Sequence, residues 1–293
     1  AGRFAPSPTG PLHLGSLLTA LASFLDARAR NGIWLVRMED LDPPREMAGA
    51  ADDILRTLEQ YGLHWDGEVV YQSQRHARYE DAVQNLLQQG HAFYCTCSRK
   101  DLQALGARAY PGTCRGQRAK PPQEHAIRVQ VENSDIHFDD ALQGSCIFNL
   151  HDDGGDFIIK RKDGLYAYHL AVVIDDAMQR ITHIVRGSDL LDSTPRHIHL
   201  QRLLGLPTPH YAHLPVIVNA QGQKLSKQTF ATALPRTDPV PALFACLQAL
   251  GQQPPAQLRR ATRDELLGWG IGHWSLARVP HCLSLSEPSL ARR

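Results

Sequence analysis

The sequence predicts an α/β fold that begins with a β-α-β unit built to bind a nucleotide. Three observations lead to this prediction. Apolar residues recur at helical spacing over 14–30, short apolar segments at 2–5 and 33–38 flank them, and a turn rich in proline and glycine precedes the helix. Such a turn holds the backbone rigid and close to a ligand, and the helix start directs free N–H groups and a positive dipole end at phosphate.

Farther along the chain, strands and helices continue to alternate. The expected elements, in order, are helices over 45–61 and 76–89, extended segments at 126–131 and 157–160, a turn at 163–164 leading into 165–168 as a hairpin, a strand at 181–185, a helix over 194–204, a strand at 215–218 and a helix over 240–250. Gly62 and Gly90 stand where the first two helices should end. This order predicts a Rossmann-like nucleotide domain with an inserted middle domain.

The turn at 6–16 is the first of two segments suited to phosphate. His13 stands immediately before the helix, where the charge of a bound phosphate would develop, and Gly15 and Ser16 open the helix. Taken alone, the segment could equally be an ordinary turn with a capping or core histidine.

The second segment, 218–228, is a polar loop that contains Lys224, Ser226 and Lys227. Two ammonium groups three residues apart can converge on one polyphosphate, and a mobile loop can close during reaction and release the products afterwards. Taken alone, such a lysine pair is usually a solvated surface feature.

Together and in this order, the two segments resemble the HIGH and KMSKS signatures of class I aminoacyl-tRNA synthetases. Segments 3–7, 37–43 and 184–190 are similar to the glutamyl and glutaminyl branch, and the similarity runs from residue 3 to about residue 250. Leu225 and Gln228 depart from the KMSKS pattern, but the lysine pair is intact. Leucine in place of methionine conserves volume.

Chain length distinguishes the branches of this family. After the second segment only about 65 residues remain, so we expect a short helical C-terminal region and no anticodon-binding domain. The chain in this respect resembles the truncated paralogues that activate glutamate with ATP and transfer it to queuosine in the anticodon of tRNA(Asp). The expected divisions are 1–92 and 166–235 for the two halves of the catalytic domain, 93–165 for an inserted zinc-binding subdomain, and 236–293 for the C-terminal region.

Glutamate carries two carboxylates and one ammonium group, so its site needs cationic forks and one anion. The resemblance implies that Arg3 and Arg186 supply the forks and that Glu39 supplies the anion. The full implied set for glutamate is Arg3, Phe4, Ala5, Pro6, Ser7, Glu39, Tyr168 and Arg186. Two structural alternatives stay open: an ion pair between Arg186 and Asp189, and a place for the Tyr168 ring in the core of the hairpin.

The resemblance also implies the reaction. The glutamate α-carboxylate attacks the α-phosphorus of ATP in line, and no protein nucleophile takes part. His13, Lys224, Lys227, backbone N–H groups and Mg²⁺ stabilise the charge that passes to pyrophosphate. The implied set for ATP is His13, Gly15, Ser16, Lys224, Ser226 and Lys227. A hydroxyl on the cyclopentenediol ring of queuosine then attacks the glutamyl-adenylate.

The six cysteines are too few for a disulfide scaffold in a chain of 293 residues, so their spacing is more informative than their number. Cys95, Cys97 and Cys114 form a cluster that can bind one structural Zn²⁺ if a fourth donor is present. The resemblance implies Tyr110 as that donor. The alternative is three reduced, free thiols.

Composition adds little to this picture. Net charge is +1, which neither supports nor excludes an RNA partner, and no apolar run is long enough to span a membrane. We expect a monomeric cytoplasmic enzyme that acts on tRNA(Asp), L-glutamate and ATP and has no membrane partner. Two rival functions are a short glutamyl-tRNA synthetase that charges a tRNA 3′ end and a non-catalytic tRNA-binding module.

Overall fold

A central sheet that is parallel except for one antiparallel edge strand organises the structure, a computed structural model that describes residues 1–104, 109–219, 221–224 and 232–286. Its first part has the order β1-β2-β3, and its second part has the order β7-β6-β10-β9. The amides of Thr182 and His183 donate to the carbonyl of Ala1 at 2.9 and 3.1 Å, which places the second part beside β1. The strands are β1 (Gly2–Phe4), β2 (Trp34–Met38), β3 (Val70–Tyr71), β6 (Asp135–Asp140), β7 (Gly144–Asn149), β9 (His183–Gly187) and β10 (His210–Leu214).

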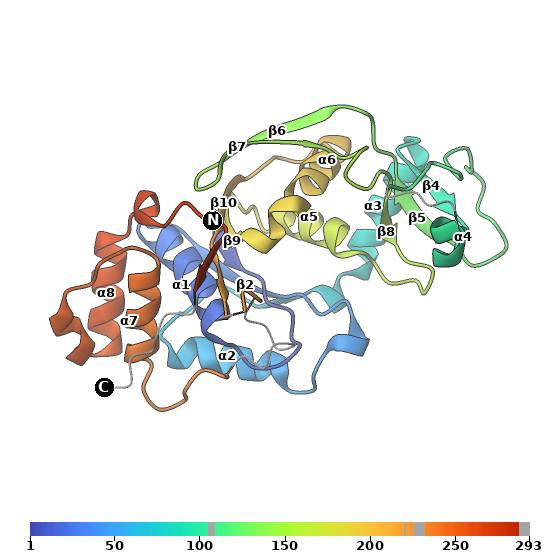
Figure 1. Ribbon diagram of the computed structural model, residues 1–293. Helices are drawn as coiled ribbons and strands as arrows, with labels where there is room; N and C mark the ends of the chain where they lie inside the picture. The colour runs from blue at the N-terminus through green and yellow to red at the C-terminus, as the bar shows by residue number, and fades with distance from the viewer. Residues whose placement is uncertain (105–108, 220, 225–231, 287–293) are drawn as a thin grey trace.

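The predicted β-α-β unit is confirmed. β1 and β2 pair in parallel, with Arg3 opposite Leu35, and α1 (Leu14–Arg28) connects them. Eleven of the 15 residues of α1 are buried, because the sheet covers one side of it and the C-terminal helices cover another. Figure 1 shows α7 (Val240–Ala249) and α8 (Arg263–His273) packed beside α1.

A smaller antiparallel sheet lies at the far end of the molecule from α7 and α8 (Figure 1). It has the order β4-β5-β8, with β4 (Ala92–Cys95), β5 (Ala126–Val129) and β8 (Phe157–Lys160), and α4 (Arg99–Ala104) follows β4. The helix α3 (His76–Gln88) leads into β4. Apart from Ala92, this sheet falls within the predicted inserted region, 93–165.

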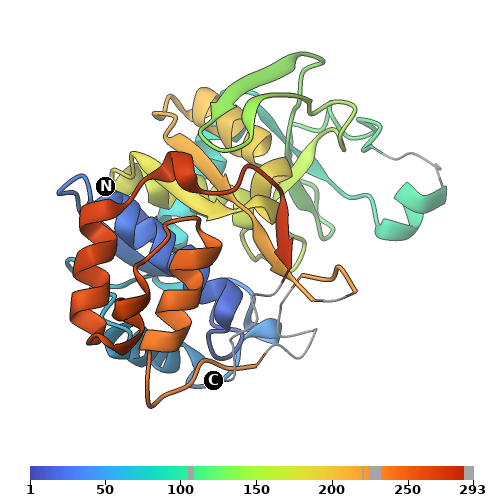
Figure 2. The same ribbon diagram turned by 60° about the vertical axis from the view of Figure 1, so that its left-hand side comes forward.

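The hairpin of β6 and β7 lies over α5 (Tyr168–Met178) and α6 (Thr194–Leu204), as Figures 1 and 2 both show. Tyr211 on β10 pairs in parallel with Asp140 on β6, so strands from the predicted insertion and from the second half of the catalytic domain share one sheet. The remaining elements are α2 (Ala50–Gln60), β11 (Val216–Val218), β12 (Ser284–Ser286) and the short 3-10 turns Pro43–Arg45, Gln72–Gln74, Ser188–Ser193, Ala256–Arg260 and Leu276–Arg278.

Two expected elements differ from the structure, and a strand that precedes a third was not expected. The helix expected over 45–61 begins only at Ala50, because two prolines force a 3-10 turn at Pro43–Arg45 and Gly49 takes a φ of +76° before the helix. The expected hairpin at 165–168 consists of one bridge, between Lys160 and Tyr166, and Tyr168 already belongs to α5. The strand expected at 215–218 is β11, and β10, which ends just before Pro215, was not predicted.

The order of the strands shows where a ligand should bind. From β1 the chain proceeds outward through β2 to β3 on one side, while β9 and β10 lie on the other. In open parallel sheets, the crevice at such a reversal, outside the carboxyl ends of the strands, is where ligands bind. Within the part of the chain that the structure describes, no helix is long and apolar enough to cross a membrane.

Candidate active site

A cavity of about 850 Å³ lies at the carboxyl ends of β1, β2 and β9 and at the start of α1. Its wall contains every residue predicted to bind glutamate or ATP that the structure describes. These are Arg3, Phe4, Ala5, Pro6, Ser7, His13, Gly15, Ser16, Glu39, Tyr168, Arg186 and Lys224. The other two, Ser226 and Lys227, lie outside the described residues. Segments separated by more than 200 residues therefore meet at one site.

His13 forms the N-terminal cap of α1. Its Nδ1 accepts a hydrogen bond from the Ser16 amide at 3.3 Å, and the Ser16 hydroxyl accepts from the His13 amide at 3.3 Å. A neutral imidazole that accepts at Nδ1 carries its proton on Nε2, so the ring can donate from that atom. Gly10, in the preceding turn, has a φ of +140°, a conformation that favours glycine. The capping and phosphate interpretations of His13 are therefore compatible.

Arg3 and Arg37 share one buried carboxylate. Arg3 Nε and Arg37 Nη1 lie 3.1 and 2.8 Å from Asp176 Oδ1 on α5, and all three side chains are almost fully buried. Burial by itself would raise the pKa of Asp176, but the two guanidinium groups hold that pKa below its usual value. Sequence reasoning missed Arg37 and Asp176. The adjacent Asp175 and Asp176, inside an apolar run, were a usable signal, because buried charges need partners.

Glu39 follows β2 and lies at the cavity wall beside Arg37, whose Nη2 is 3.3 Å from Glu39 Oε1. Burial raises the pKa of Glu39, and Arg37 and Arg3 oppose that rise. Tyr168, at the start of α5, lines the same cavity, and its hydroxyl lies 3.5 Å from Arg186 Nη1. The alternative that placed the Tyr168 ring in a hairpin core is therefore wrong.

Arg186, on β9, lines the cavity but is only 3% exposed. Its guanidinium contacts two histidines, Thr194 and the carbonyl of Leu190. The alternative of an Arg186–Asp189 ion pair is wrong, because Asp189 pairs with Lys224 at 2.5 Å instead. That pair lies at the cavity wall and holds the start of the second phosphate segment beside it.

The predicted metal cluster also comes together. The sulfur atoms of Cys95, Cys97 and Cys114 all lie within 4.8 Å of one another, and Cys97 Sγ is 3.5 Å from Cys114 Sγ. The Tyr110 hydroxyl lies 3.4 Å from Cys95 Sγ. Four ligands around a tetrahedral zinc with bonds of about 2.0–2.3 Å are separated by about 3.3–3.8 Å. The separations of 3.5 and 3.4 Å fall within that range.

The electrostatics of this cluster favour one thiolate. Burial alone would raise the pKa of Cys114, but hydrogen bonds from Tyr110 and from the backbone of Thr96 lower it to about 7. Burial and the neighbouring thiols raise the pKa of Cys97 to about 11. The Arg128 guanidinium lies 4.1 Å from the centre of the Tyr110 ring, and its Nε donates to Cys95 Sγ at 3.4 Å. This positive charge would offset the negative charge of a zinc-bound set of thiolates.

Comparison with known protein families agrees with this geometry. The family model described as tRNA synthetases class I (E and Q), catalytic domain, matches residues 1–266. A solved glutamate-tRNA synthetase from Elizabethkingia anophelis superposes with a TM-score of 0.82 at 26% identity. That match covers 98% of this chain and 68% of the solved chain.

Curated relatives match over a greater share of their own length. The glutamyl-Q tRNA(Asp) synthetase of Ectopseudomonas mendocina is 54% identical over 289 residues, which are 99% of this chain and 98% of the relative. The protein of the same name from Pseudomonas aeruginosa strain PAO1 is 53% identical over 289 residues, with the same coverage. Here, unlike in the longer solved synthetase, almost all of both chains is matched.

Proposed function

The chain belongs to the glutamyl-Q tRNA(Asp) synthetase family and has the class I catalytic fold, and from this premise we propose that it transfers glutamate to queuosine in tRNA(Asp). As a member of this family it is a ligase-type enzyme that uses ATP. The proposal covers the acceptor base and the role of each side chain.

One observation carries the proposal: a single cavity brings together charged groups suited to the two carboxylates and the ammonium group of glutamate and hydrogen-bond donors suited to the phosphates of ATP. Arg3 and Arg186 face it with positive charge and Glu39 with negative charge, while the N-terminus of α1 and His13 form the wall beside them. An amino acid with two carboxylates and one ammonium group needs such a set. A triphosphate needs the helix terminus and nearby donors.

The arrangement suits an in-line transfer. Arg3, Arg186 and Glu39 would hold glutamate so that its α-carboxylate faces the α-phosphorus of ATP. His13, the first amides of α1, Lys224 and Lys227 would stabilise the charge that passes to pyrophosphate. The glutamyl-adenylate is then attacked by a hydroxyl of the queuosine ring, and AMP leaves. The part that residues 225–228 take in adenylate formation is assigned from the sequence motif alone.

Mg²⁺ accompanies ATP in this proposal and supplies positive charge to the phosphates when bound. Among the described residues, the cysteine cluster is the only group of three or more metal-ligating side chains that the structure brings together. Mg²⁺ commonly keeps several waters and binds mainly through substrate phosphates. We therefore assign it no protein ligand.

The acceptor can be tested directly with labelled glutamate, ATP and Mg²⁺. We expect label on a 3′-phosphorylated anticodon stem-loop of tRNA(Asp) that carries queuosine, and none on the same stem-loop with guanosine. The stem-loop has no acceptor end, and its terminal phosphate removes the remaining 3′ diol. Label therefore reports the base alone.

Two other outcomes would overturn the proposal. Label that requires full-length tRNA with an intact 3′ end would indicate a short glutamyl-tRNA synthetase. Absence of both label and glutamate-dependent ATP–pyrophosphate exchange would indicate a non-catalytic tRNA-binding module.

We further propose that Cys95, Cys97, Tyr110 and Cys114 hold one structural Zn²⁺. The spacing of their donor atoms and the low pKa of Cys114 support this, because zinc binds thiolates. The ion would fasten the segment after β4 to the turn around Cys114 and so stiffen the smaller sheet. It supplies no chemistry to the reaction at the cavity.

We expect the purified protein to contain about one zinc per chain and Cys114→Ser to bind zinc at least about a hundredfold more weakly. Four ligands share an apparent binding free energy of about 10–16 kcal/mol, so one ligand accounts for a few kcal/mol. Cys282→Ser, outside the cluster, is the matched control. Elemental analysis and competition with a chromogenic chelator measure both quantities. Equal zinc affinity in the two variants would contradict the assignment.

A further inference from the structure

Arg186 differs from the buried arginines Arg3 and Arg37 in how it is held. Arg3 and Arg37 share the carboxylate of Asp176, which offsets part of their charge. Among the residues that the structure describes, no carboxylate forms an ion pair with Arg186. The acceptors around its guanidinium are neutral groups: the imidazoles of His213 and His197, the hydroxyls of Thr194 and Tyr168, and the carbonyl of Leu190.

His213, on β10, is the acceptor for the inner edge of that guanidinium. Arg186 Nε donates to His213 Nε2 at 3.0 Å, and His213 Nδ1 lies 2.6 Å from Asp140 Oδ2. An arginine Nε–H can only donate, so His213 Nε2 must carry a lone pair and the ring proton must be on Nδ1. The Asp140 carboxylate, which can only accept when ionised, stabilises that tautomer.

Asp140 is itself held rigidly at the end of β6. Its Oδ1 accepts from the amides of Leu142, Gln143 and His213 at 3.0, 2.9 and 3.1 Å, and the side chain is fully buried. Burial by itself would raise the pKa of Asp140, but the bonds to His213 and the backbone keep that pKa below its usual value. The Asp140 carboxylate is therefore ionised and fixed in place.

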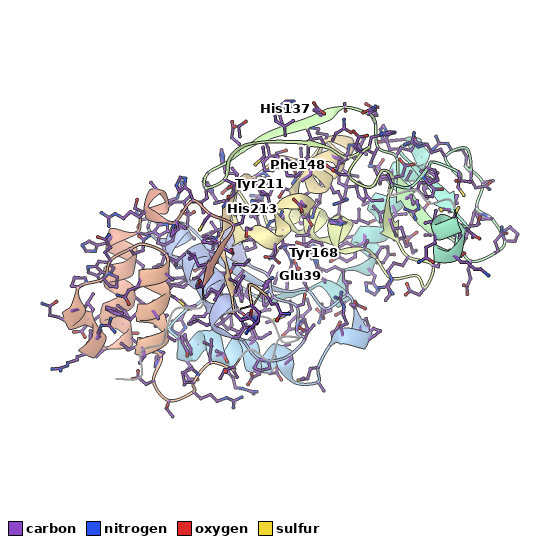
Figure 3. The ribbon with its side chains drawn as sticks, viewed as in Figure 1. Glu39, His137, Phe148, Tyr168, Tyr211 and His213 are labelled. Carbon is purple, nitrogen blue, oxygen red and sulfur yellow. The ribbon has the colours of Figure 1, made fainter. Side chains whose placement is uncertain are left out.

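The second histidine supports the same arrangement. His197 Nδ1 lies 3.3 Å from both terminal nitrogens of Arg186, and His197 Nε2 lies 3.2 Å from His169 Nδ1. Burial and the Arg186 charge lower the pKa of His197 well below its ordinary value, and burial also lowers the pKa of His213. Both rings are therefore neutral near pH 7 and can accept hydrogen bonds. In Figure 3, His213 lies between the β6–β7 hairpin and the Tyr168 and Glu39 side chains.

We propose that His213, oriented by Asp140, is a positioning residue that holds the Arg186 guanidinium through a neutral acceptor and so keeps its positive charge available for a carboxylate of glutamate. The inference rests on the proposed function, in which Arg186 binds glutamate. A carboxylate in place of His213 would hold Arg186 equally well but would compete with the substrate for its charge. A neutral histidine accepts the hydrogen bond without carrying a negative charge, so it can orient Arg186 without competing with glutamate for the guanidinium.

Two substitutions at His213 separate its hydrogen bond with Arg186 from its hydrogen bond with Asp140. Asparagine places its amide where Nδ1 lies, so His213→Asn keeps a donor for Asp140 and leaves Arg186 Nε without an acceptor. Glutamine reaches the Nε2 position, so His213→Gln keeps an acceptor for Arg186 and removes the donor to Asp140. His210→Asn, at an exposed position on the same strand, is the control.

We expect His213→Asn to raise the KM for glutamate in ATP–pyrophosphate exchange by about ten- to a hundredfold, the effect of leaving a buried charged donor unpaired. The KM for ATP should change by less than about twofold. His213→Gln should keep the glutamate KM within about threefold of the parent value. Its melting temperature should nevertheless fall more than that of His213→Asn, because it loses the 2.6 Å bond to Asp140.

The test depends on which His213 variant has the higher KM for glutamate. His213 would be only a structural residue if His213→Gln had both the higher KM for glutamate and the lower melting temperature. The same conclusion would follow if the KM for glutamate and the KM for ATP rose together. A parent protein without glutamate-dependent exchange would instead overturn the proposed function, and this inference with it. Equilibrium binding of glutamate to each variant provides a check that does not depend on turnover.

Discussion

Arg186→Ala is expected to lower kcat/KM for glutamate activation by about a hundred- to several-thousand-fold. Removing one partner of a buried, hydrogen-bonded charge pair costs about 3–5 kcal/mol, and here the partner left behind is a carboxylate of the substrate. Arg186 is nearly fully buried and already oriented by five neighbouring groups, so little ordering is required when glutamate binds. The measurement is ATP–pyrophosphate exchange at varied glutamate, together with the melting temperature of each variant.

Arg186→Lys helps to separate charge from geometry. Lysine keeps the positive charge but cannot form the planar fork, so we expect it to recover only part of the loss. Arg202→Ala, at an exposed position on α6, serves as the matched control and should leave exchange unchanged. A parent-like glutamate KM in a well-folded Arg186→Ala protein would contradict the role assigned to this arginine.

Lys227→Ala is expected to lower the rate of adenylate formation by about a hundred- to a thousandfold while leaving the Kd for glutamate unchanged. Removing one preorganised group that stabilises transition-state charge typically costs this much. The glutamate groups in the cavity are all contributed by other segments, so ground-state binding of the amino acid should persist. Single-turnover formation of glutamyl-adenylate measures the first quantity, and equilibrium binding measures the second.

The control for this variant is Lys120→Ala, because Lys120 is exposed and absent from the cavity wall. Near-normal pyrophosphate exchange by Lys227→Ala would contradict the assignment of 218–228 as a phosphate-binding segment. Weaker glutamate binding with an unchanged chemical rate would place Lys227 at the amino-acid site instead.

Local signals made some elements predictable. The start of α1 was predicted correctly, because its cap is local: the His13 side chain bonds to Ser16, only three residues later. The helix over 194–204 was predicted with its observed bounds, and Gly205 takes the left-handed conformation that ends it. In both cases the determinants lie within one helical turn of the boundary.

Other elements gave a weaker local signal. The helix α5 was not predicted, because a helix that is buried on several sides lacks the amphipathic period that reveals helices. The hairpin β6–β7 was missed, because its first strand contains three aspartates and a histidine. The helix α8 is an exception, because the capping box between Thr262 and Glu265 is a local pattern that marks its start in the sequence.

The sequence by itself determined which groups we propose for the site: the phosphate segment at the helix start, the arginines and Glu39 for glutamate, and the three cysteines with Tyr110. Only the tertiary structure decided which partners hold these groups. In that structure, Arg3 pairs with the carboxylate of Asp176, 173 positions away, and Arg186 donates to the neutral ring of His213. Charge pairing depends on distance and burial in three dimensions, whereas sequence periodicity reports only which face of an element is apolar. Whether a carboxylate of the protein already pairs with an arginine, or leaves it available to substrate, could therefore be learned only from the tertiary structure.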